Sequence, residues 1–243
     1  MSDTIPDDLP PKLRLDHQLP ARDWAIRTVH APASFEELEL ARRRLVLEEL
    51  FYLTAGLAQL HRRRQAGEGC LCKALSPNGF TDLLPYALTQ AQQAALTTIF
   101  TDLSSGKPMN RLLQGDVGSG KTVVAAGAVW LAAQSGWQSA LMAPTEILAA
   151  QHYQTLSALF DGTGIRVGLL TGSMKAREKR DIRERLELGM LDLVVGTHAL
   201  LSAGVDFARL GLVITDEQHR FGVTQRSALS AKGGRPHVLV MSA

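Results

Sequence analysis

From about Leu84 onward, short apolar runs alternate with longer stretches of helical character, and this alternation limits the chain to few folds. We predict strands at Arg111–Gln114, Ser139–Ala143, Arg166–Leu170, Leu191–Val195, Leu210–Thr215 and Val238–Ser242. Helical stretches begin near Lys121, Thr145, Met174 and His198. Strands that alternate with helices are typical of a parallel, doubly wound sheet with helices on both faces, so we predict an α/β fold.

The part of the sequence before this alternation differs in character. Residues 1–33 hold five of the ten prolines, which favours extended or turn backbone over a packed domain. Ser34 and Glu37 form the pattern of a capping box, and the residues after them are rich in helix formers. We therefore predict an extended segment over 1–33, a helical linker over 34–80 and an α/β domain over 81–243.

The composition narrows the class of protein without identifying a partner. A formal net charge of +2 is too small to argue for nucleic acid by itself, so such a partner must be argued from sites. No apolar run approaches the ~20 residues of a membrane-spanning helix, and the first residues lack the order of a secretory signal. Cys70 and Cys72 have no second pair of zinc ligands at a suitable spacing, so we expect reduced thiols. These features predict a cytoplasmic protein without a membrane partner.

A glycine-rich segment comes after the first predicted strand. Residues 115–122 read Gly-Asp-Val-Gly-Ser-Gly-Lys-Thr, which fits the phosphate-binding pattern G-x-x-x-x-G-K-[ST]. Glycines let the backbone turn tightly and approach phosphate oxygens without a Cβ in the way. The candidate phosphate contacts within the loop are Gly115, Gly118, Ser119 and Gly120.

The last two residues of this motif begin a predicted helix. Lys121 is expected to reach the β and γ phosphates of a nucleoside triphosphate, and Thr122 to place its hydroxyl on Mg²⁺. The helix also aims its free amides and the positive end of its dipole at the same phosphates. The alternative is a glycine turn before a helix that binds nothing, but the strand, loop, Lys-Thr and helix together favour phosphate binding.

Two adjacent acids come after the apolar run Leu212–Ile214. Asp216 is placed to hold Mg²⁺ through its water shell, and Glu217 to orient and deprotonate the attacking water. The alternative is a pair of solvated acids, of which Asp216 caps the next helix. The upstream phosphate-binding motif favours the first interpretation, so we predict Lys121, Asp216 and Glu217 as catalytic residues.

Other residues admit two interpretations from spacing alone. Gln92 completes a capping box with Thr89, and its side chain could equally grip the edge of adenine; the two roles are compatible. Thr145, Thr171 and Thr197 each come after a predicted strand, where they could present a hydroxyl to a phosphate. Ordinary helix capping is the alternative for these threonines, and spacing alone favours it.

These motifs, in this order, resemble the first motor lobe of the superfamily-two helicases. The resemblance is carried by residues 109–122, by Ala143–Ala149 and by Asp216–Val223, and it extends from about Phe35 to the end of the chain. It implies a RecA-like, ATP-driven translocase on double-stranded DNA that remodels branched DNA such as stalled forks and Holliday junctions, with ATP and Mg²⁺ as cofactors.

The resemblance also implies roles for individual residues. Gln92 would contact adenine, and the stretches of Thr145, Thr171 and Thr197 would touch the DNA backbone. The residues that would couple the nucleotide state to the grip on DNA are Gln218, His219 and Ser242.

Three parts of such a motor are expected outside this sequence or at its ends. A wedge domain that reads branched DNA would precede residue 1, and residues 1–33 would be the stretch directly after that domain. A second motor lobe with an arginine finger would come after the third helicase motif, which is cut after Ser242 and Ala243. We therefore expect this chain to bind nucleotide but barely to hydrolyse it alone.

The nearest alternative is the transcription-repair coupling translocase. That protein tends to carry an aromatic residue where this chain has Ser119, and an Asp-Glu-Glu sequence where this chain has Asp-Glu-Gln. Both differences favour the branched-DNA helicases. Alternatives of another class are a P-loop ATPase that does not act on DNA and a non-catalytic nucleotide-binding module.

Overall fold

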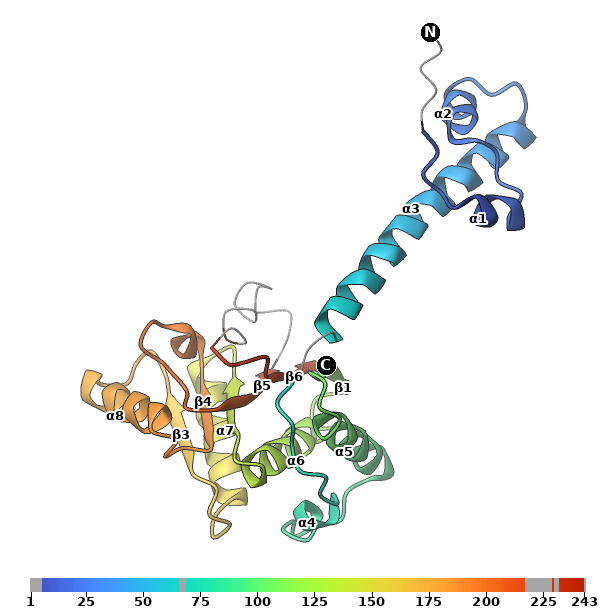
Figure 1. The fold of residues 1–243 in the computed structure, drawn as a ribbon. Helices are drawn as coiled ribbons and strands as arrows, with labels where there is room; N and C mark the ends of the chain where they lie inside the picture. The colour runs from blue at the N-terminus through green and yellow to red at the C-terminus, as the bar shows by residue number, and fades with distance from the viewer. Residues whose placement is uncertain (1–5, 66–68, 217–228, 230–231, 243) are drawn as a thin grey trace. The chain divides into compact units, whose positions relative to one another are not determined.

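The computed structural model describes residues 6–65, 69–216, 229 and 232–242 (Figure 1). The chain divides into two compact units, Met1–Arg64 and Gln65–Ala243, which are described separately. None of the helices within the described residues is long and apolar enough to cross a membrane.

The first unit is helical. It contains α1 (Pro11–Asp16), α2 (Arg22–His30) and the long α3 (Phe35–Gln65). The prediction of extended backbone over 1–33 is therefore wrong for two stretches. Proline is tolerated in the first turn of a helix, where its missing N–H has no helical partner, and Pro11 is the first residue of α1. Proline at this position is thus compatible with the helix that it begins.

A buried arginine holds the first unit together. Arg44 of α3 is fully buried, and its guanidinium donates to Asp7 Oδ1 at 2.7 Å, to Glu48 and to the Pro20 carbonyl at 3.0 Å. A buried charge is tolerated only when it is paired and hydrogen-bonded, as it is here. The cluster joins α3 to the segments that precede α1 and α2.

The second unit is built on a parallel sheet of six strands in the order β1-β6-β5-β2-β4-β3. The strands are β1 (Asn110–Gln114), β2 (Gln138–Met142), β3 (Val167–Leu170), β4 (Leu193–Gly196), β5 (Leu210–Asp216) and β6 (His237–Ser242). All six were predicted from the apolar runs to within two residues at either end. The predicted doubly wound α/β fold is confirmed.

Helices cover both faces of this sheet. The described helices are α4 (Asn78–Thr81), α5 (Gln90–Leu103), α6 (Lys121–Gln134), α7 (Glu146–Leu159), α8 (Ala176–Glu187) and the short 3₁₀ helix η1 (His198–Leu201). Residues of α5, α6 and α7 pack with Leu212 and Ile214 of β5 on one face. Residues of α8 and η1 pack with Val213 on the other face, as the alternation of side chains along a strand requires.

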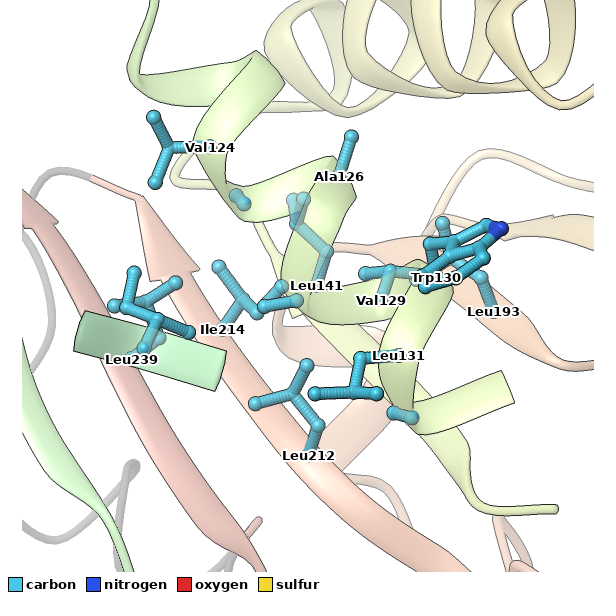
Figure 2. Close-up of a cluster of buried hydrophobic side chains, with 14 of the residues drawn as sticks. Val124, Ala126, Val129, Trp130, Leu131, Leu141, Leu193, Leu212, Ile214 and Leu239 are labelled. Carbon is cyan, nitrogen blue, oxygen red and sulfur yellow. The ribbon is translucent and has the colours of Figure 1, made fainter. Parts of the chain in front are cut away.

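Helix α6 is the centre of the larger core. Its residues from Val123 to Ala132 are all buried, and a helix that is apolar all round must be covered on every side. Figure 2 shows its side chains among Leu141, Leu212, Ile214 and Leu239 of the strands. On the side of α5, Gly127 admits close approach, because a Cβ there would lie 2.3 Å from Leu96 Cδ1.

A buried histidine, His237, hydrogen-bonds the segment around Cys70, which precedes α4, to the sheet. His237, the first residue of β6, accepts the Met109 N–H at its Nδ1 at 3.0 Å and donates from Nε2 to the Cys70 carbonyl. Burial lowers the pKa of His237. The imidazole is therefore held neutral, since a proton on Nδ1 would break the bond from Met109.

We predict that this histidine makes stability depend on pH. In the unfolded chain His237 has a pKa near ~6.5, whereas its folded pKa is lower, so its contribution is complete above pH ~6.5 and is lost as the pH falls. The urea midpoint of unfolding should drop between pH ~7.5 and pH ~5.5. His237→Gln should weaken this dependence, and an equally steep dependence in the variant would contradict the assignment.

Candidate functional site

The strand order sorts the predicted site residues into two groups along one edge of the sheet. All strands are parallel, so their carboxyl ends share an edge. The strands β1, β6 and β5 are neighbours in the sheet. The glycine-rich loop, which begins at Gly115, follows β1, while β6 ends at Ser242 and β5 ends at Asp216. The strands β2, β4 and β3 are also neighbours. Thr145 lies three residues after the end of β2, Thr197 directly follows β4, and Thr171 directly follows β3.

The glycine-rich loop has the backbone geometry that its sequence predicts. Gly118 and Gly120 have φ angles of +84° and +81°, which favour glycine over residues with a Cβ. Gly120 is the N-cap of α6, and Gly115 N–H donates to the Ser242 carbonyl at 3.2 Å. The loop is thus anchored to β6 at one end and to a buried helix at the other.

Lys121 is placed at the start of α6 and folds back over the loop. Its Nζ donates to the carbonyl oxygens of Gly115 and of Asp116, the latter at 2.9 Å. Both partners are neutral, so the ammonium has no competing carboxylate among these contacts. A triphosphate oxygen would be a stronger, charge-assisted acceptor. The loop therefore fits a nucleotide phosphate tail.

Asp216 is the last residue of β5. It alternates with Leu212 and Ile214, so its side chain belongs to the face of the sheet that α6 and α7 cover. His152 of α7 meets it there, with His152 Nε2 2.7 Å from Asp216 Oδ2. The two side chains are only 12% and 15% exposed. The predicted metal-binding carboxylate is therefore nearly buried and hydrogen-bonded.

His152 was not anticipated from the sequence. The signal that could have found it is its place on α7, because it lies three residues after the buried Ala149 and four before the buried Leu156. A histidine in the core-facing stripe of a helix needs a polar partner, and Asp216 is that partner. The pair itself depends on tertiary structure.

Four residues complete the predicted nucleotide and coupling set. Glu217, Gln218 and His219 lie outside the described residues. Ser242 is buried at the end of β6, next to the glycine-rich loop.

Gln92 fulfils its capping role and also contacts the glycine-rich loop. Its Oε1 accepts the Thr89 N–H at 2.9 Å, and its own backbone N–H donates to Thr89 Oγ1, which confirms the predicted capping box. Its Nε2 donates to the Ser119 carbonyl at 2.9 Å. One amide side chain therefore joins the start of α5 to the loop.

A pocket lies beside Gln92 and the start of α6. Its volume is about 510 Å³, and its wall includes Leu83, Pro85, Tyr86, Gln92 and Thr122. An apolar wall with an aromatic ring and a few polar groups is the usual form of a small-molecule site. Gly120 also lines the pocket, so the pocket adjoins the end of the glycine-rich loop.

The three threonine stretches differ in what they expose. Thr145 caps α7, with its hydroxyl accepting the Leu148 N–H at 3.2 Å. Thr171 and Thr197 are both buried, and the Thr197 hydroxyl has no hydrogen-bond partner within the described residues. The exposed residues at these strand ends include His198, and Ser173 lies at the turn after β3.

A side-chain carboxylate of the protein occupies the turn after β3. The carboxylate of Glu146, the first residue of α7, accepts the Ser173 N–H at 3.0 Å and the Ser173 hydroxyl. The hydrogen bond from this hydroxyl is the largest influence on the pKa of Glu146, which is lowered. The turn after β3 thus offers an amide and a hydroxyl that suit a negatively charged oxygen.

The two cysteines belong to the core. Cys70 and Cys72 are buried free thiols, and burial raises the pKa of Cys72 to about 11. No group of three or more metal-ligating side chains is found in the described part of the chain.

Comparisons with known proteins agree with this geometry. The family model described as DEAD/DEAH box helicase matches residues 89–243. A Synechocystis protein named ATP-dependent DNA helicase RecG is 51% identical, over 98% of this chain and 29% of its own length. The Bacillus subtilis protein of the same name is 47% identical, over 100% of this chain and 36% of its own length. The chain thus spans about a third of the length of these relatives.

Two solved structures extend the comparison. The structure of RecG bound to a three-way DNA junction matches with a TM-score of 0.84 and 43% identity, covering 98% of this chain and 32% of that one. The UvsW helicase of bacteriophage T4 has a TM-score of 0.53 and 15% identity over 71% of this chain and 62% of that one, which shows a shared fold alone. The family match spans more than half of the sequence and contains the glycine-rich loop, Lys121 and Asp216. The chain resembles RecG and belongs to the DEAD/DEAH box helicase family.

Proposed function

We propose that this chain is the ATP-binding part of a RecG-type DNA helicase that remodels branched DNA in recombination and repair. The observation that carries the proposal is that the predicted nucleotide residues and the predicted DNA-contacting residues lie at opposite ends of one edge of the sheet. Strands β1, β6 and β5 place the glycine-rich loop and Asp216 toward one end of this edge, while β2, β4 and β3 place the stretches of Thr145, Thr197 and Thr171 toward the other. The similarity to a protein whose structure contains a three-way DNA junction supports the same conclusion.

The nucleotide half would hold ATP by its triphosphate. The loop amides and the start of α6 would bind the phosphates, and Lys121 would exchange its two carbonyl partners for β- and γ-phosphate oxygens. Thr122 and Asp216 supply the hydroxyl and carboxylate oxygens that suit Mg²⁺. When bound, Mg²⁺ would neutralise charge on the β and γ phosphates. Glu217 would orient and deprotonate the attacking water.

The pocket beside Gln92 would hold adenine. Gln92 uses one amide hydrogen on the Ser119 carbonyl and keeps the second for the base. Tyr86 and Pro85 line the same pocket and offer apolar surface. Gln92 would then contact both the base and the loop that holds the phosphates.

The other half would contact the phosphates of double-stranded DNA. Thr145 and the turn after β3 lie at the ends of strands whose carboxyl ends are neighbours, and the turn already binds the Glu146 carboxylate. Backbone amides and hydroxyls commonly position a nucleic-acid strand in this way. Because Thr171 and Thr197 are buried, we assign the contacts to the more accessible Ser173 and His198 beside them.

Catalysis would require parts beyond this chain. A second motor lobe would supply an arginine finger, which is worth roughly 10³–10⁵ in rate in related P-loop enzymes. A wedge domain would read the branch. Gln218, His219 and Ser242 would relay the nucleotide state to the DNA contacts. We infer that the chain alone binds ATP but hydrolyses it poorly.

Lys121→Ala should weaken binding of a fluorescent ATP analogue. The loss of a charged hydrogen-bond donor should cost about 1.5–3 kcal/mol, or roughly 10- to 150-fold in affinity. Lys107→Ala, an exposed lysine that precedes β1, is the matched control and should bind like the unchanged chain. Equal affinity in the Lys121 variant would refute the phosphate-binding role of the loop.

Adding a second motor lobe from a RecG relative should restore ATP hydrolysis stimulated by branched DNA. Glu217→Gln should abolish this turnover while leaving nucleotide affinity unchanged, because the amide cannot take a proton from water. Normal turnover by the variant would show that Glu217 is not the base. If the lobe restores no turnover at all, the chain is a nucleotide-binding module.

The chain should bind a three-way DNA junction in a salt-dependent manner. Each phosphate that a lysine or arginine neutralises would lower the affinity roughly three- to fourfold between about 50 and 200 mM salt. Ser173→Ala should weaken binding by about 0.5–1.5 kcal/mol through the lost hydroxyl. Thr98→Ala, whose hydroxyl donates to a carbonyl of its own helix, should bind normally. Binding that ignores both salt and Ser173 would argue for an ATPase that does not act on DNA.

A further inference from the structure

The contact between His152 and Asp216 joins two parts of the chain that the sequence keeps 64 residues apart. His152 comes from the core-facing stripe of α7, and Asp216 from the end of β5. Both side chains are nearly buried, with 12% and 15% of their surface exposed. The carboxylate therefore cannot turn freely in solvent.

The chemistry of the two groups gives the direction of the hydrogen bond. An ionised carboxylate is an acceptor only, so His152 Nε2–H donates to Asp216 Oδ2 at 2.7 Å. One carboxylate oxygen is thus anchored, and the second, Oδ1, can face a cation or its water.

We propose that His152 is a positioning residue that holds Asp216 for the Mg²⁺ of bound ATP. The inference rests on the proposed function, because it takes Asp216 as the metal-binding carboxylate. Carboxylates that bind metals are commonly fixed by a second hydrogen bond, and removing that partner typically weakens metal binding about 10- to 100-fold. His152 acts through Asp216 and touches neither nucleotide nor metal.

A purely structural role makes a different prediction. His152 lies between Ala149 and Leu156 on α7, so it could serve only to satisfy a polar group inside the core. In that case its replacement would lower the melting temperature and leave metal affinity unchanged in the folded protein. The two roles are therefore separated by measuring the metal directly.

The experiment is an electron paramagnetic resonance titration of Mn²⁺, used in place of Mg²⁺, into the full chain saturated with a non-hydrolysable ATP analogue. His152→Asn places its amide near the position of Nδ1 and cannot reach Asp216, so Mn²⁺ affinity should fall about 10- to 100-fold. His152→Gln places an amide N–H near the position of Nε2 and should restore most of the affinity. Nucleotide affinity measured in EDTA should be the same in all variants.

Two further variants complete the test. Gln151→Ala, an exposed neighbour on α7, should bind Mn²⁺ normally. Asp216→Ala should lose Mn²⁺ affinity at least as strongly as His152→Asn. If Asp216→Ala weakens Mn²⁺ binding but His152→Asn does not, the positioning role is overturned while the proposed function stands. If Asp216→Ala has no effect, the metal assignment of the proposed function fails, and the role of His152 fails with it.

Discussion

The burial of α6 against the sheet is the constraint on which the rest of the second unit depends. Its residues from Val123 to Ala132 are all buried, so the helix has one place in the fold, between the strands and α5. Its first residue is Lys121, which means that the same packing fixes the lysine and the loop before it. The apolar contacts of α6 thus determine where Lys121 and the glycine-rich loop lie.

The order of the strands adds a second constraint. β6 separates β1 from β5, and β2 separates β5 from the two strands beyond it. Lys121 and Asp216 therefore lie toward one end of the edge, and Thr145 and Ser173 toward the other. Both pairs of residues are held by one continuous, hydrogen-bonded sheet.

Much of this arrangement could be predicted from sequence because its signals are local. Glycines predict the turns of the glycine-rich loop, Thr145 predicts the start of α7, and apolar runs predict all six strands. The helices within 1–33 were missed because proline was taken to exclude helix, whereas Pro11 begins one. Contacts such as His152 with Asp216 and Glu146 with Ser173 could not be predicted, because each joins elements that meet only after folding.

Helix α7 reaches both ends of this surface. Glu146, the first residue of α7, accepts a hydrogen bond from Ser173 in the loop after β3. His152 lies six residues further along α7, which is roughly 9 Å along a continuous helix. Both residues therefore belong to one continuous helix. A movement of Glu146 away from Ser173 that carried α7 with it would therefore also move His152 relative to Asp216.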